Sequence, residues 1–264
     1  MKTKSEEKQC NIMGMVMIAP TRMIVADNTN FKIKLIDNEK CVVVTENKMS
    51  SQPVDVIILP ENKLAVTLES EKCIQIMSYT DVDLSSDRRI DVKELCNGIA
   101  YCHYKFVVTC WSSKKIIIIN LEGCILKVLR SPAMFNGPSR VLISKDEKFL
   151  YVTDRDLRSN SSVMKIDLEG NLISVFKESG YAVPYGLQQL EDETILVCFQ
   201  DRGTVLRLTS SLKRCDIIGP EKENMYRPKA ITYCHIYHKL YVSCSSEKGK
   251  QNADIVKIFN VKWI

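Results

Sequence analysis

Residues Gly137–Phe176 read GPSRVLISKDEKFLYVTDRDLRSNSSVMKIDLEGNLISVF and contain the pattern that is repeated through the chain. Short apolar runs alternate with turn-forming residues, which predicts four strands, at Arg140–Ser144, Phe149–Thr153, Val163–Asp167 and Leu172–Phe176. None of these runs is long enough for a helix. Four antiparallel strands in about 40 residues match the size of one β-propeller blade.

The same unit occurs five more times. Its second strand appears in six versions, MIVAD, LAVTL, FVVTC, LYVTD, ILVCF and LYVSC, whose central valines are spaced by 41, 42, 44, 45 and 45 residues. These valines are Val25, Val66, Val108, Val152, Val197 and Val242. Because a single blade cannot bury both faces of its sheet, six such units predict a ring. We therefore predict an all-β, six-bladed β-propeller of four-stranded antiparallel blades, with the six valines buried between blades.

The domain boundaries follow from these units. We expect a polar tail at residues 1–9 and one propeller at 10–264, with blades at about 10–47, 52–93, 98–130, 137–177, 184–219 and 228–264. Blade two contains a charged stretch, Thr80–Arg89, that we expect to be a long connection. The last blade is predicted to be incomplete, because only NVKWI follows its third strand at Asp254–Phe259. Such a blade exposes a sheet edge, so we expect that Met1 either lies inside a longer natural chain or is a misplaced gene-model start, and that the closing strand belongs to the segment before it.

Two segments carry a family resemblance. VADNTNFKIKLID (Val25–Asp37), and LYVTDRD followed by VMKIDLEGNLISVF, resemble the second and third strands of the NHL repeat. The whole chain resembles the NHL/YVTN-like propeller at the C-terminus of tripartite-motif (TRIM) proteins, in the divergent form common in invertebrates. The other four blades lack the Asp-x-x-Asn hairpin of that repeat. The resemblance implies a propeller that selects the partner of a ubiquitin ligase if RING and B-box modules lie upstream.

Composition favours a cytoplasmic protein without a membrane partner. No apolar run approaches the ~18 residues of a membrane span, and the charged start MKTKSEEKQ is unlike a signal peptide. The 11 cysteines are therefore interpreted as reduced, buried, small apolar side chains. With 37 basic and 32 acidic side chains, the formal net charge of +5 is mild for a nucleic-acid-binding protein.

Standard catalytic motifs are absent from the sequence. Two Tyr-Cys-His triplets, Tyr101–His103 and Tyr233–His235, place cysteine beside histidine, and His238 lies close to the second. Neighbouring residues of a strand face opposite sides of the sheet, so we interpret these groups as structural. The sequence thus predicts no catalytic residue, no metal ligand, no cofactor and no enzymatic activity in this chain.

Asp27 and Asp154 each end a second strand. Gluconolactonase-like six-bladed propellers, a related class, hold a divalent metal on their axis through Glu, Asn and Asp side chains, so a metal-dependent lactonase or hydrolase is an alternative function. The favoured interpretation is that each carboxylate accepts hydrogen bonds from its own turn.

One mouth of the ring is expected to bind partners, because loops vary without disturbing the blades. Arginine and aromatic side chains are concentrated in the loops between blades and between second and third strands. The candidates are Trp111, Lys114, Arg140, Arg155, Arg158, Tyr185, Arg202, Tyr226, Arg227 and Lys229. They suit an acidic peptide or the phosphates and bases of RNA. The predicted function is a platform for a protein or peptide partner, with single-stranded RNA binding as an alternative; this domain does not set an oligomeric state.

Overall fold

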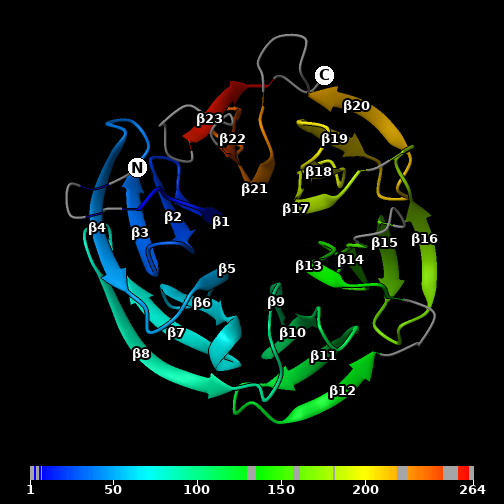
Figure 1. The fold of residues 1–264 in the computed structure, drawn as a ribbon, viewed down its shortest axis with the longest axis horizontal. Helices are drawn as coiled ribbons and strands as arrows, with labels where there is room; N and C mark the ends of the chain where they lie inside the picture. Colours follow the sequence, from blue (N-terminus) through cyan, green and yellow to red (C-terminus); the bar gives the residue numbers. More distant parts are fainter. Residues whose placement is uncertain are drawn as a thin grey trace.

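The computed structural model describes residues 3, 6, 8–129, 135–156, 161–180, 182–218, 225–245 and 255–261. It is an all-β propeller of six sheets arranged around a common axis (Figure 1). Five sheets have four antiparallel strands, and the sixth has three among the described residues. The predicted fold, including an incomplete last blade, is therefore confirmed. No helix among the described residues is long and apolar enough to cross a membrane.

The strands follow the chain from the centre of the ring outwards in every blade. Blade one contains β1 (Ile12–Ala19), β2 (Arg22–Asp27), β3 (Lys32–Asp37) and β4 (Val42–Lys48), and blade two contains β5 (Pro53–Leu59), β6 (Lys63–Leu68), the short 3-10 helix η1 (Glu69–Glu71), β7 (Cys73–Tyr79) and β8 (Leu84–Asp91). Blade three contains β9 (Ile99–Cys102), β10 (Lys105–Cys110), β11 (Lys115–Asn120) and β12 (Ile125–Leu129), and blade four contains β13 (Pro138–Ile143), β14 (Phe149–Asp154), β15 (Ser162–Asp167) and β16 (Leu172–Phe176). Blade five contains β17 (Pro184–Gln189), β18 (Ile195–Phe199), β19 (Thr204–Leu208) and β20 (Arg214–Ile218), and blade six contains β21 (Pro228–Cys234), β22 (Lys239–Cys244) and β23 (Ile255–Asn260).

One prediction about blade two is wrong. The charged stretch Thr80–Arg89 is mostly strand, because β8 begins at Leu84 and pairs with β7 along its length. The polar and charged side chains of this outermost strand face water, and Leu84 and Ile90 face the core. Polarity on an outer strand therefore does not indicate a loop.

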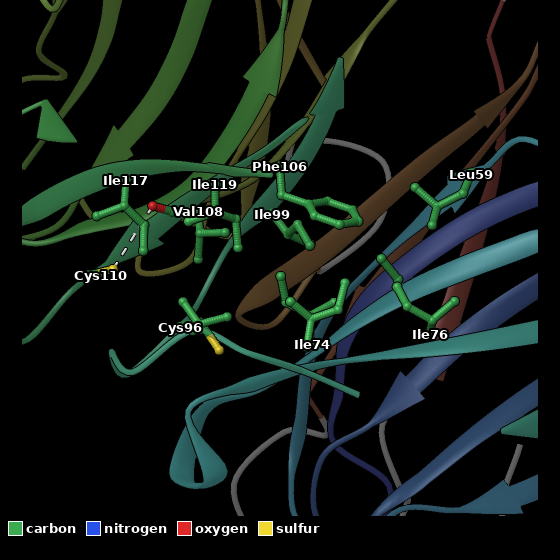
Figure 2. Close-up of a cluster of buried hydrophobic side chains, with 13 residues drawn as sticks. Leu59, Ile74, Ile76, Cys96, Ile99, Phe106, Val108, Cys110, Ile117 and Ile119 are labelled. Carbon is green, nitrogen blue, oxygen red and sulfur yellow. Dashed lines mark hydrogen bonds between the residues drawn. The ribbon is translucent and has the colours of Figure 1, made fainter. Parts of the chain in front are cut away.

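The core lies between blades, where the flat faces of neighbouring sheets pack together. Figure 2 shows this packing for blades two and three: Ile74 and Ile76 of β7 face Phe106 and Ile119 of blade three. The six central valines of the second strands are all 0% exposed, as predicted, which confirms the register of the repeat.

A hydroxyl group follows the central valine in four of the six blades, and in three of them, at Thr67, Thr109 and Ser243, it joins neighbouring blades. In blade three, Thr109 Oγ1 accepts the N–H of Gly98 at 2.7 Å and donates to the carbonyl of Ser139 in blade four at 2.9 Å. Thr67 in the same way accepts the N–H of Asp55 and donates to the carbonyl of Asn97 in blade three. A hydroxyl is both donor and acceptor, so one side chain satisfies two buried backbone groups.

The ring closes through the same kind of hydrogen bond. Ser243 Oγ accepts the N–H of Ala230 at 2.8 Å and donates to the carbonyl of Ile12, at the start of blade one, at 3.0 Å. Apolar side chains of blades one and six, among them Val25 and Tyr241, form one buried cluster around this bond. Closure between the first and last blades thus rests on side-chain packing and a hydroxyl bridge in the described residues.

We expect the substitution Thr109→Val to lower the free energy of unfolding by about 2–4 kcal/mol, because the side chain keeps its shape but leaves a buried N–H and a buried carbonyl without partners. Thr109→Ser keeps the hydroxyl and loses one buried methyl group, so it should cost about 1 kcal/mol. Urea unfolding of both variants measures the difference. Equal losses for valine and serine would show that the hydroxyl bridge contributes nothing.

Candidate functional site

The ring has two different faces. We call the face formed by the loops between second and third strands, together with the segments between blades, the mouth. The other face carries the hairpins between first and second strands and between third and fourth strands, and we call it the hairpin face. Each face is considered in turn.

The innermost strands surround a small cavity of about 80 Å³, and the side chain of Arg140 lines it. Arg140 belongs to blade four, and its Nη2 donates to the carbonyl of Met13 in blade one and to that of Val54 in blade two, both at 3.0 Å. Its Nε lies 3.9 Å from Oδ2 of Asp55. With only 5% of its surface exposed, Arg140 ties three blades together across the axis. The expectation that Arg140 is available to partners at the mouth is not met, because its side chain is buried and bonded to carbonyls of two other blades.

Asp55 is the anionic counterpart of Arg140 in the cavity. Its carboxylate accepts the N–H of Ile99 at 3.2 Å and that of Val56 at 3.0 Å. Burial raises the pKa of Asp55 above its ordinary value, although the charge of Arg140 and the two N–H groups act in the opposite direction. Removing Arg140 would therefore leave a carboxylate that is costly to keep ionised.

Tyr185 connects the cavity with the mouth. Its ring is 6% exposed and lies between two guanidinium groups, with Cζ of Arg140 5.1 Å and Cζ of Arg155 4.4 Å from the ring centroid. Arg155 directly follows β14, and its backbone N–H donates to the carbonyl of Gly137 at 2.9 Å. Its guanidinium has no hydrogen-bond acceptor and no acidic partner among the described residues, and its Nε is buried. Stacking on Tyr185 thus fixes an unpaired cation at the mouth.

Trp111 and the backbone of Arg155 both lie against Gly137. A β-carbon added to Gly137 would overlap Trp111 Nε1 and approach the carbonyl oxygen of Arg155 to 2.7 Å, so only glycine fits between them. Nε1 of Trp111 is also buried without an acceptor in the described part of the chain. We call Trp111, Arg155 and Tyr185 the mouth cluster; it combines residues of blades three, four and five.

The remaining predicted mouth residues lie apart from this cluster. Lys114 occupies an exposed turn with a φ of +50°, and Arg202 is exposed and donates to the carbonyl of Ser179. Tyr226 and Arg227 are exposed before β21, whereas Lys229 lies on β21 and donates to Oδ1 of Asn11. Arg158 is outside the described residues.

Asp154 and Asp27 are both buried and have separate partners. Asp154 accepts the N–H groups of Asn136 and Gly137, from the segment before β13, whereas residues 157–160 of its own turn lie outside the described residues. Asp27 does accept from its own turn, through Asn30, and also forms an ion pair with Lys34 at 2.7 Å. These two carboxylates belong to blades one and four, and the structure does not bring them into a common metal site.

Lys34 fills a buried cluster beside Asp27. Its Nζ lies 2.8 Å from Glu6, a residue of the segment predicted to be a polar tail, and donates to Cys10 Sγ at 3.4 Å. Burial opposes ionisation of Glu6 and Asp27, but the hydrogen bonds and charge of Lys34, together with the other donors to each carboxylate, lower the pKa of both groups. An ammonium group therefore holds the position that a metal ion would take among these acidic and thiol groups.

The hairpin face contains a second cluster that the strand pattern argued against. Cys102 Sγ lies 2.9 Å from Nδ1 of His103, and Nε2 of the same ring lies 2.9 Å from Glu147. His103 is in the turn after β9 with a φ of +46°, so the alternation of a strand does not apply to it. Burial and the nearby Glu147 carboxylate raise the pKa of Cys102. The interpretation of this Cys-His pair as facing apart is wrong.

A sequence signal for this cluster existed in the repeat. His103 and Glu147 are 44 positions apart, as are the central valines Val108 and Val152. They occupy equivalent hairpins of adjacent blades, which the ring brings side by side. By contrast, His235 is exposed, and the ring of His238 forms a hydrogen bond with the hydroxyl of Tyr233.

Comparison with known proteins identifies the fold and no closer relationship. No family model matches the chain, and no curated protein matches it either. Among solved structures, virginiamycin B lyase from Staphylococcus aureus has a TM-score of 0.67 at 14% identity over 98% of this chain and 87% of that one. A catalytically inactive histidine-to-alanine variant of that lyase with quinupristin has a TM-score of 0.66 at 16% identity, over 96% and 85%. Hydrazine synthase of Kuenenia stuttgartiensis has a TM-score of 0.66 at 16% identity, over 92% and 77%.

These similarities correct one prediction. The sequence predicted no enzymatic activity. That exclusion is wrong, because proteins that share the fold over nearly the whole length of this chain are enzymes. At 14–16% identity the likeness shows the fold alone and assigns no reaction.

We expect Arg140→Met to lower the free energy of unfolding by about 3–5 kcal/mol at pH 7, because it leaves Asp55 as an uncompensated buried charge. The pKa of Asp55 in the folded protein is already raised and should rise further in this variant. The loss of stability is therefore complete above that pKa, and it disappears as the pH falls towards the pKa of Asp55 in the unfolded chain. Urea unfolding between pH 7 and pH 4 measures this dependence. In Arg140→Met with Asp55→Asn the pH dependence should vanish, and its persistence would contradict the pairing.

Proposed function

We propose that the propeller is a recognition module that binds an acidic segment of a protein partner at the mouth cluster. The observation that carries the proposal is the guanidinium of Arg155, which is stacked on Tyr185 and has no acceptor among the described residues. A half-buried cation without a partner is costly unless something else supplies the anion. A carboxylate of the partner would supply it through a two-point hydrogen bond.

The surroundings of Arg155 favour a peptide over an isolated anion. The Tyr185 ring fixes the position of the Arg155 cation, and the half-buried Trp111 lies close to the Arg155 backbone across Gly137, where its exposed part adds apolar surface for a peptide. Tryptophan, tyrosine and arginine are the side chains that most often dominate the free energy of protein binding. Because the guanidinium of Arg140 already packs against the Tyr185 ring, this ring should lose little conformational entropy when a partner binds.

This role agrees with the tripartite-motif propellers that the repeat resembles. In such a setting the propeller would select the partner and other modules would supply ubiquitin-ligase activity. RNA binding is the weaker candidate, because the formal net charge is only +5 and phosphate contacts usually need a broader basic surface.

We expect Arg155→Gln to weaken binding of a fluorescein-labelled hexaglutamate peptide by about 2 kcal/mol, or about thirtyfold, since the charge-assisted pair is lost. Fluorescence anisotropy at physiological ionic strength measures the affinity. Arg214→Gln is the matched control: Arg214 is a partly exposed arginine on the outermost strand β20, far from the mouth, and its loss should leave the affinity unchanged.

Equal affinities of the parent and Arg155→Gln for the peptide would rule out the mouth cluster as the binding site. Labelled oligouridylate tests the nucleic-acid alternative in the same assay. Tighter binding of oligouridylate than of peptide, with a steep loss of affinity as salt increases, would show an RNA-binding module and overturn the proposal.

A further inference from the structure

We propose that Cys102, His103 and Glu147 form a three-ligand site for a divalent cation of the zinc class, open to a pocket of about 330 Å³ between blades three and four. The site lies on the hairpin face and is independent of the mouth cluster.

The donor set suits zinc. A thiol sulfur, an imidazole nitrogen and a carboxylate oxygen are the three side-chain ligands that zinc uses most, and one ligand atom from each residue lies within 4.8 Å of the others. Zinc–ligand bonds of about 2.0–2.3 Å place ligand atoms roughly 3–4 Å apart, so small side-chain rotations complete the site. The His103 side chain is 73% exposed and has room for such a rotation.

Two tight turns hold the ligands in place. His103 and Tyr104 both have positive φ, +46° and +59°, between the paired residues Cys102 and Lys105, which is the geometry of a two-residue hairpin. Glu147 is in the neighbouring turn of blade four, where its N–H donates to the carbonyl of Ser144 at 2.8 Å. The ligands therefore come from short, hydrogen-bonded turns on rigid strands, which limits the cost of assembling them.

The other cluster of potential ligands serves as an internal comparison. Glu6, Cys10 and Asp27 also gather within ligand distance, but Lys34 supplies their positive charge. Glu147 forms its ion pair with His103, and no lysine or arginine among the described residues pairs with it. Lys105 lies near Cys102 and lines the adjoining pocket, but it forms no ion pair with Glu147, so the hairpin cluster has the carboxylate and the soft donor of a metal site without a lysine bound between them.

The adjoining pocket indicates what the bound metal would face. Its walls include Val107, Ile118, Leu126, Ile143 and Leu168, and Cys102 and His103 lie at its edge. Three protein ligands leave a fourth position for water or an added group, as in catalytic zinc centres. With a volume in the range of small-molecule sites, the pocket fits a ligand that combines an apolar body with a metal-binding oxygen, such as a carboxylate.

The test is titration of the full chain with Co²⁺ alone, which reports thiolate coordination through a ligand-to-metal charge-transfer band. We expect saturation at one equivalent, displacement by Zn²⁺, loss of the band in Cys102→Ser, and an affinity at least about tenfold lower in Glu147→Gln. The combined Cys41→Ser, Cys124→Ser and Cys215→Ser variant removes the exposed cysteines outside the site and should bind like the parent.

The proposal is overturned if the parent binds no Co²⁺, if the band survives in Cys102→Ser, or if it disappears in the triple serine variant. Selective alkylation of Cys102 by iodoacetamide in a chain that binds no Co²⁺ would instead show a metal-free Cys-His pair. Circular dichroism confirms that each variant is folded. Hexaglutamate binding should be unchanged in Cys102→Ser, so failure of one proposal leaves the other testable.

Discussion

The ring depends on the hydroxyl that follows the central valine of the second strand. At that position the innermost strand of each blade bulges or begins, and a backbone N–H loses its partner in the sheet. Thr67, Thr109 and Ser243 accept that N–H and pass their own hydrogen to a carbonyl of the next blade. Apolar packing supplies most of the stabilisation between blades, but it tolerates sliding. These hydrogen bonds are directional, so they set how far the blades are displaced relative to each other at three junctions, from blade two to three, from blade three to four and across the closure from blade six to blade one.

The axis has a different constraint, because six innermost strands converge there and their polar groups cannot all reach water. One guanidinium, that of Arg140, satisfies carbonyls of Met13 and Val54 and offsets the charge of Asp55. Its outer face supports Tyr185, which in turn supports Arg155. The buried cation of Arg140 thus serves the fold, whereas Arg155, which contacts the same ring, has no anionic partner in the described part of the chain and is the proposed contact for a partner. Two arginines that look equivalent in sequence have opposite roles because only one of them meets buried acceptors.

The sequence was sufficient for the architecture, because the spacing of Val25, Val66 and the later valines reports a property shared by all blades, burial between sheets. It was less informative about single positions. Thr80–Arg89 was predicted as a connection because its side chains are mostly polar or charged, although the strand β8 that begins at Leu84 needs only two inward apolar residues. Arg140 was expected among the residues of the mouth, because the sequence does not show that carbonyls of Met13 and Val54 in other blades accept hydrogen bonds from its side chain. His103 was placed on a strand whose turn begins one residue earlier, and that single residue reverses the direction of its side chain.

The Cys-His-Glu cluster shows how a repeat architecture builds sites from distant positions. Consecutive blades place equivalent turn residues next to each other, so two residues one repeat apart become neighbours whatever lies between them. His103 and Glu147 are such a pair, and Cys102 joins them because a two-residue turn directs adjacent side chains to the same side. Strand centres must remain apolar to pack, whereas these turns contribute little to the core and can change their chemistry freely. New binding sites on this fold are therefore expected where hairpins of adjacent blades meet, and they can be found by reading the sequence at the spacing of its repeat.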